Sequence, residues 1–134
     1  MRIEHAAGPI DIAVSGLRAQ NKQMEVISSN IANSRTTNAG NGEPYRRLEA
    51  IFKTQKNDIS GVSVERIAKD TGDFARVLEP GHPQADANGY VQMPNVSIPV
   101  EMMNLNMATR TYQANAAVLR RYQQMVDATL ELLR

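Results

Sequence analysis

The chain has 134 residues, of which 42% are hydrophobic and 22% are charged, and its formal net charge of +1 favours neither nucleic acid nor anionic lipid as a partner. The length allows one domain, and the absence of cysteine excludes disulfides, thiolate metal sites and thiol nucleophiles. Aromatic residues make up only 4% of the chain, which is low for a compact enzyme core, so we expect an aliphatic and helical core.

The first predicted element is a helix over about residues 10–33, within an N-terminal unit of residues 1–35. Pro9 suits a first helical turn, and Asp11 lies where a carboxylate favours the helix dipole. Gly16 inside the helix indicates either close backbone approach to a neighbour or a merely tolerated glycine. Apolar residues recur every seven positions and form a narrow stripe that needs a partner helix: Ile10, Leu17, Met24 and Ile31.

Asn30 and Asn33 stand beside this stripe at the end of the predicted helix. A buried amide at such a position can fix the register between helices. A simple role at the helix C-terminus is the equally supported alternative.

The middle of the chain, residues 36–94, is predicted to form a loop and a small β-rich lobe. Residues 34–44 are poor in apolar side chains, and we interpret them as a mobile loop. From Tyr45 the apolar period changes to two, which predicts a half-buried strand with Leu48, Ala50 and Phe52 on one face.

Three further short β segments are predicted at 62–64, 74–78 and 90–93. Asn88 and Gly89 suit a turn that needs a positive φ. We expect this turn to lead into a strand without requiring a tight hairpin.

The C-terminal unit, residues 95–134, is predicted to be dominated by one helix over residues 99–134, because no glycine or proline interrupts it from residue 100 onward. At a rise of about 1.5 Å per residue it spans about 54 Å, against about 36 Å for the first helix, so it must extend past its partner. Its exposed end would carry Leu130, Leu132 and Leu133, which we expect another molecule to cover. Its apolar positions again follow a repeat of seven, with flanking members: Met102, Leu105, Tyr112, Leu119, Val126, Leu130 and Leu133.

The sequence contains no arrangement typical of a catalytic or cofactor site. His5 and His82 are the only histidines, and a metal site would require both to meet. Residues 84–95 loosely follow a calcium loop but have Gln84 and Asn95 where acidic ligands are needed, so that site is rejected. We expect no metal, no cofactor and no small-molecule substrate. The arginine pairs 46–47 and 120–121 lack the aromatic neighbours of a nucleic-acid site.

Four segments resemble the bacterial flagellar basal-body rod proteins, a family of rod and hook axial subunits. Residues 28–33 are similar to the N-terminal rod signature, with Ile31 in place of its leucine, and they are followed by residues 44–47, 79–96 and 101–115 in the family order. The segment 81–96 is the most specific of the four, and departures are confined to residues 1–9 and 35–43. The matching signature residues are Asn30, Asn33, Tyr45, Pro80, Gly81, Asp86, Gly89, Tyr90, Pro94 and Asn95.

The resemblance implies a non-enzymatic structural subunit of the proximal rod. The fold would be mainly α, with the terminal helices paired as a coiled-coil-like bundle and a small inserted β lobe. The partners would be copies of the same chain, other rod proteins and the flagellar type III export apparatus. We expect export without a cleaved signal peptide, a place in the rod that crosses the periplasm, and no membrane span.

Three alternatives remain at this point. A distal rod or hook-type subunit is the alternative within the same family. A module that binds nucleic acid or a lipid surface would show salt-sensitive binding to DNA or anionic vesicles. A small enzyme would show a cleft with convergent titratable groups.

Overall fold

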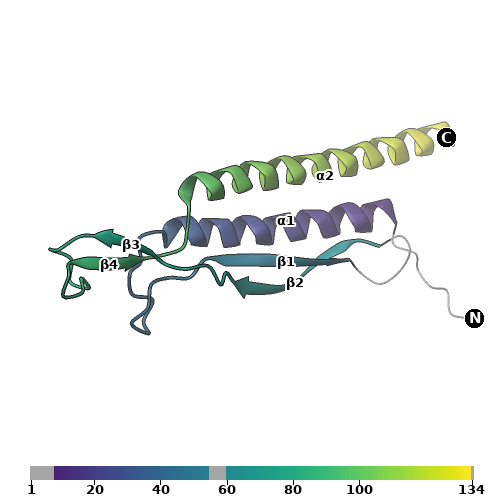
Figure 1. Cartoon of the computed structure of the whole chain (residues 1–134). Helices are drawn as coiled ribbons and strands as arrows, with labels where there is room; N and C mark the ends of the chain where they lie inside the picture. The colour runs from purple at the N-terminus through teal and green to yellow at the C-terminus, as the bar shows by residue number, and fades with distance from the viewer. Residues whose placement is uncertain (1–7, 55–59, 134) are drawn as a thin grey trace, which may run out of the picture.

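The computed structural model describes residues 8–54 and 60–133, and two long helices dominate it (Figure 1). The prediction of a mainly α fold with a small β part is confirmed, although the β part consists of two separate two-stranded sheets. The elements in chain order are α1 (Pro9–Ala32), β1 (Leu48–Thr54), β2 (Val62–Lys69), β3 (Ala75–Leu78), β4 (Tyr90–Met93) and α2 (Ile98–Leu132).

Helix α1 begins where the sequence predicts, with Pro9 in its first turn. The Asp11 carboxylate accepts a hydrogen bond of 3.1 Å from the Gly8 backbone N–H, which satisfies one of the free donors at the helix start. The helix ends at Ala32, and the loop that follows is closed by two backbone hydrogen bonds, from Ala39 to Glu43 and from Tyr45 to Thr36.

Strands β1 and β2 form an antiparallel hairpin that pairs Leu48 with Lys69 and Thr54 with Val62. Strand β2 is longer than the predicted segment 62–64 and continues to Lys69. A bulge at Glu65 of β2, which has no partner in β1, shifts the pairing register between Ile51 and Phe52. The predicted apolar face of β1 is only partly buried. Ala50 is buried, whereas Phe52 is exposed to 39%.

Strands β3 and β4 form a second antiparallel pair, here called the β ribbon. All four residues of β3 are exposed, so hydrogen bonds to β4 and few buried contacts support it. Gly89 has a φ of +82°, the conformation expected for the turn before β4. The prediction of a turn leading into a strand therefore agrees with the structure, and the chain between the two strands is longer than a tight hairpin.

Helix α2 has 35 residues and runs without a break, as its composition predicts. It starts one residue before the predicted Pro99, while the predicted end at Arg134 lies outside the described residues. At about 1.5 Å per residue, α2 is about 52 Å long and α1 about 36 Å.

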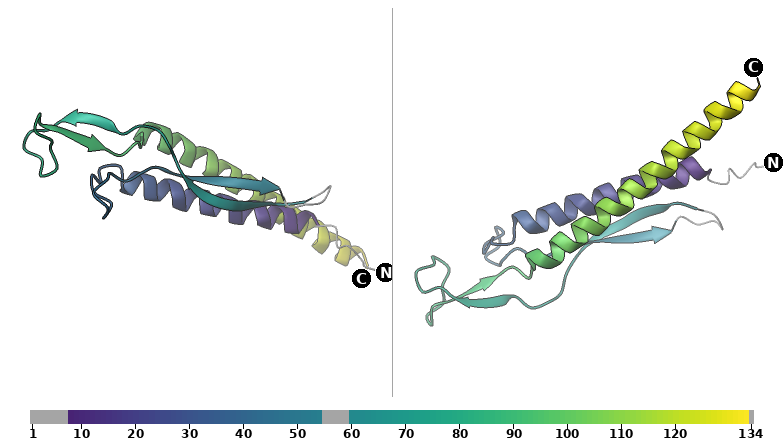
Figure 2. Two further views of the ribbon diagram at one scale, coloured as in Figure 1. Left: turned by 60° about the horizontal axis from the view of Figure 1, so that its bottom comes forward. Right: turned by 90° about the horizontal axis from the view of Figure 1, so that it is seen from above.

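The elements are arranged in three layers along most of the molecule. Helix α1 lies between α2 on one side and the β1–β2 hairpin on the other, and the β ribbon projects beyond the end where α2 begins (Figure 1). The two helices run in opposite directions, and α2 crosses α1 obliquely (Figure 2). The buried residues are mostly small and aliphatic: Ala13, Ala19, Val26, Ile27, Ala50, Val91 and Ala108.

Candidate functional site

Polar side chains meet where the end of α1, the start of β1 and the first turn of α2 come together. We call this cluster the polar junction, and it comprises Asn30, Tyr45, Arg47, Asn95 and Glu101. Asn30 and Glu101 are both 0% exposed. Buried polar groups are stable only with hydrogen-bond partners, so the geometry here has to satisfy each of them.

The amide of Asn30 forms four hydrogen bonds. Its nitrogen donates to the Leu48 carbonyl at 2.8 Å and to Glu101 Oε2 at 3.0 Å. Its oxygen accepts from the Leu48 N–H at 2.9 Å and from the Tyr45 hydroxyl at 3.0 Å. One side chain therefore holds α1 to both β1 and α2.

The Glu101 carboxylate also accepts a hydrogen bond of 2.7 Å from Arg47 Nε, which makes a buried ion pair between α2 and the segment before β1. Arg47 NH1 lies 3.5 Å from Asp70 and 3.9 Å from Glu49. Burial lowers the pKa of Arg47, but the hydrogen bond from Arg47 to Glu101 and the three carboxylates outweigh this effect and raise its pKa above the usual value. The guanidinium is therefore held in its charged form.

The two other asparagines of the family signature, Asn33 and Asn95, have different roles. Asn33 is the C-cap of α1, and its amide nitrogen donates to the Ser29 carbonyl at 2.9 Å. Asn95 accepts a hydrogen bond of 2.8 Å from the Arg47 N–H and donates to the Gly72 carbonyl at 3.2 Å. The sequence left two interpretations open for Asn30 and Asn33. The Asn30 amide links α1 to other elements, whereas Asn33 has the role at the helix C-terminus.

Helices α1 and α2 approach each other closely at Gly16 of α1. A Cβ placed on Gly16 would lie 2.7 Å from Asn115 Nδ2, closer than real Cβ atoms come. Of the two interpretations of Gly16, the structure therefore supports close approach. Ala13 and Ala19 of α1 and Ala108 of α2 are buried at 3–4% exposure.

The predicted stripe residues lie beside this contact and on the open surface. Leu17, Met24 and Ile31 of α1 and Leu105 and Leu119 of α2 are half-buried. The other members are exposed: Ile10, Met102, Tyr112, Val126, Leu130 and Leu133.

The C-terminal end of α2 runs past the N-terminal end of α1, as the difference in length predicts (Figure 1). We call residues 122–133 the α2 tail. Its largest side chains are open to solvent, with exposed fractions of 59% for Leu130, 88% for Leu132 and 79% for Leu133.

Helix α2 carries a further apolar row that was not predicted from the sequence. We call it the second stripe: Val100, Met103, Met107, Val118 and Met125. These residues are separated by three, four, eleven and seven positions, which keeps them on one side of a helix. All five are exposed, from 45% to 61%. The helical spacing of these five residues is a signal in the sequence itself, but it lies on a different side of α2 from the predicted repeat of seven.

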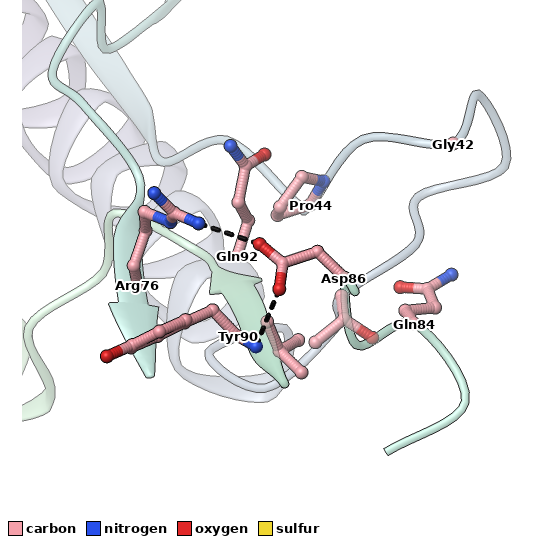
Figure 3. Close-up of a pocket in the computed structure, with 9 residues that line it drawn as sticks. Gly42, Pro44, Arg76, Gln84, Asp86, Tyr90 and Gln92 are labelled. Carbon is pink, nitrogen blue, oxygen red and sulfur yellow. Dashed lines mark hydrogen bonds and ion pairs between the residues drawn. The ribbon is translucent and has the colours of Figure 1, made fainter. Parts of the chain in front are cut away.

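The signature residues that lie outside the polar junction mainly shape the β ribbon. The Asp86 carboxylate accepts backbone hydrogen bonds of 2.9 Å from Tyr90 and from Asn88, and it forms an ion pair of 2.7 Å with Arg76 (Figure 3). The hydrogen bond from the Tyr90 N–H, followed by that from Asn88 and the charge of Arg76, holds the pKa of Asp86 below its usual value. Pro80 packs against Gly89, and Pro94 is buried after β4.

A pocket of about 300 Å³ lies between this ribbon and the loop that contains Gly42 and Pro44 (Figure 3). Its single carboxylate, that of Asp86, is already engaged by Arg76 and two backbone N–H groups. The pocket therefore presents no free carboxylate.

The described residues also contain no group of three or more His, Asp or Glu side chains placed to hold a metal. His82 accepts a hydrogen bond from the Gln84 N–H, and His5 lies outside the described residues. Within the described part of the chain, neither helix combines the length and the apolar character that a membrane crossing requires.

Comparisons with known proteins agree on one family. A family model described as flagella basal body rod protein matches residues 10–39, and one described as flagellar basal body rod FlgEFG protein C-terminal matches residues 87–132. The matched segments include nearly all of α1 and the whole of α2.

Three curated relatives, each named flagellar basal-body rod protein FlgC, are similar to the chain over almost its full length. The relative from Agrobacterium fabrum is 41% identical, covering 92% of this chain and 91% of the relative. The relative from Salmonella typhimurium is 42% identical, with 91% and 93% covered, and that from Bacillus subtilis is 38% identical, with 92% and 95% covered.

Proposed function

This chain belongs to the FlgC family of flagellar basal-body rod proteins, and we propose that it is built into the rod through its two terminal helices. As a member of that family, it is a structural subunit of the basal-body rod. The proposal adds that copies of the chain and other rod proteins are the partners that cover its exposed helical surfaces.

The exposed α2 tail is the observation that carries the proposal. Full burial of a leucine side chain contributes about 1.5–3 kcal/mol. Leu130, Leu132 and Leu133 are more than half exposed, so a partner that covers all three would gain about 3–7 kcal/mol before the cost of association. In an assembly of many subunits, this gain in free energy would be repeated at every contact between neighbouring subunits.

The three-layer arrangement supports the proposal mechanically. A shaft that transmits torque has to resist sliding between subunits, and long helices that interlock along their length resist sliding because many buried contacts would break together. We propose that the helices pair with neighbours in a coiled-coil-like way around the axis, with the β1–β2 hairpin and the β ribbon outside.

We also propose that the chain reaches the rod, which crosses the periplasm, by passing unfolded through the flagellar type III apparatus, without a cleaved signal peptide. The absence of cysteine is compatible with this route because the chain has no disulfide to reduce or form. We propose no enzymatic activity, because the family is one of structural rod proteins.

The test uses a strain that lacks its own copy of the gene. The variant Leu130→Asp/Leu133→Asp places two carboxylates where the proposal requires burial, and Gln124→Asp is the matched control on the polar side of the same tail. All three positions are exposed, so folding of the remaining chain should be unaffected.

We expect the double variant to be synthesised and exported at the normal level but to be missing from purified basal bodies, with loss of motility. The control should incorporate and restore motility. Normal incorporation of the double variant would show that the tail leucines are not part of the assembly surface.

A further inference from the structure

We propose that the second stripe of α2, with the groove beside it, receives the α2 tail of a second copy of this chain, so that copies associate head to tail. The inference rests on the proposed function and specifies one contact within it. It names the receiving surface, the occupant and the direction in which the two helices run.

The receiving surface is a shallow groove of about 190 Å³ between α1, β1 and α2. Met107 of the second stripe forms one wall, and Phe52 of β1, exposed to 39%, forms another. The Oε1 atom of Gln23, which also lines the groove, is buried and has no hydrogen-bond partner among the described residues. A partner that brings apolar side chains would therefore fit this groove better than water does.

The α2 tail is the segment of the described chain that matches this surface in chemistry. Every residue from Gln123 to Leu133 is exposed. Val126, Leu130 and Leu133 lie on one side of the tail, where they continue the side of α2 that packs on α1 farther back.

Charge complementarity supports a second copy as the occupant. The exposed charged side chains of α2 are basic over residues 110–121, from Arg110 to Arg121, and acidic in the tail, where Asp127 and Glu131 stand. Neither Arg110 nor the two acidic residues has an ion-pair partner among the parts of the chain that the structure describes. The tail therefore carries unpaired acid, and the receiving helix carries unpaired base.

The positions of these charges select a parallel arrangement of the two α2 helices. Viewed from the N-terminal end of α2, Asp127 and Glu131 lie clockwise of the apolar side of the tail, and Arg110 lies anticlockwise of the second stripe. When two parallel helices face each other, the clockwise flank of one lies beside the anticlockwise flank of the other. An antiparallel pair would separate the acids from the arginine.

A contact between two different surfaces of the same chain does not close on itself, so it leaves a free tail at one end and a free groove at the other. With Leu130 of one copy beside Met107 of the next, successive copies are displaced by about 35 Å at about 1.5 Å per residue. The contact thus extends along the helix direction, as an axial assembly requires.

The absence of native cysteine allows a direct test by cross-linking. One purified full-length chain carries Met107→Cys and another carries Leu130→Cys, and the two are mixed and oxidised. We expect a mixed disulfide dimer, because the proposed contact brings the two sulfur atoms within bonding geometry. The matched control replaces Met107→Cys by Gln113→Cys, an exposed site on the polar side of α2, and should give several-fold less dimer.

A charge exchange tests the direction of the helices. Arg110→Glu in the chain with Cys at 107 should reduce the mixed dimer several-fold, and Asp127→Arg/Glu131→Arg in the chain with Cys at 130 should restore it. Equal cross-linking at 113, or no response to the charge exchange, would overturn the proposal.

The same cysteine variants in intact basal bodies separate this inference from the proposed function. If Leu130→Cys cross-links only to a different rod protein, the tail is an assembly surface, but the surface that receives it belongs to that other protein. This result would refute the further inference and leave the proposed function standing. If the tail variant Leu130→Asp/Leu133→Asp incorporates normally, the proposed function falls as well.

Discussion

Removal of the Arg47 side chain should strongly destabilise the polar junction. The Glu101 carboxylate is 0% exposed in the native chain, and in Arg47→Ala it loses its donor at 2.7 Å and keeps the Asn30 amide at 3.0 Å. Breaking a buried ion pair from one side costs about 3–5 kcal/mol. Because the Arg47 side chain is itself 19% exposed, we expect the lower end, about 3 kcal/mol. That is a large part of the 5–15 kcal/mol typical of a folded domain.

Two companion variants separate charge from shape. Glu101→Gln keeps one acceptor oxygen, but it removes the charge and turns an amide donor toward the donor of Arg47 or of Asn30, so it should cost about 1–3 kcal/mol. The double variant Arg47→Met/Glu101→Met removes both charges and should be less destabilising than the sum of the single truncations, because neither ion is left unpaired.

The free energy of unfolding is measured by urea denaturation followed by circular dichroism, and amide hydrogen exchange at Leu48 reports locally, since its N–H donates to Asn30. Arg66→Ala is the control. It removes an exposed arginine whose ion pair with Glu65 is 3.9 Å long and should change stability by less than about 0.5 kcal/mol. A cost of Arg47→Ala no larger than that of the control would refute the reasoning.

Three further predictions follow from the helix contact and the β ribbon. Gly16→Ala should gain up to about 1 kcal/mol of helix propensity only when Asn115→Ala removes the clash, so a double-mutant cycle in urea should show coupling, and additive values would contradict close approach. Gly89→Ala, at a φ of +82° and against a proline, should cost at least about 1 kcal/mol in the ribbon, measured by hydrogen exchange, whereas Gly81→Ala meets no atom within 4 Å and should not. The folded-state pKa of Asp86 is depressed, so its stabilising effect is present above the reference pKa of 3.8 and is lost as pH falls through the folded value; an NMR titration midpoint at or above 3.8 would contradict this.

Several features of this protein could be read from the sequence because they depend on local spacing. The absence of glycine and proline after Pro99 predicts an unbroken helix, and the structure has one to Leu132. The different lengths of the two helices follow directly, and with them the exposed leucines of the tail. The match of residues 28–33 and 81–96 to a rod-protein signature also needs no coordinates.

Other features of the β part were read only in part. Strand β2 was predicted for 62–64 but extends to Lys69, because pairing with β1 supports residues whose own alternation is weak. The bulge at Glu65 depends on the relative register of both strands, which neither strand encodes alone.

Tertiary structure alone decided which residues form the polar junction and where the helices touch. Asn30 and Glu101 are separated by 71 positions, and Gly16 meets Asn115 from the opposite end of the chain. Helical periodicity says which residues share a face of one helix, but it does not say which side chain of a distant helix stands opposite. Whether a glycine is tolerated or required, and whether an asparagine ends a helix or joins three elements, therefore depends on atoms that only folding brings within contact distance.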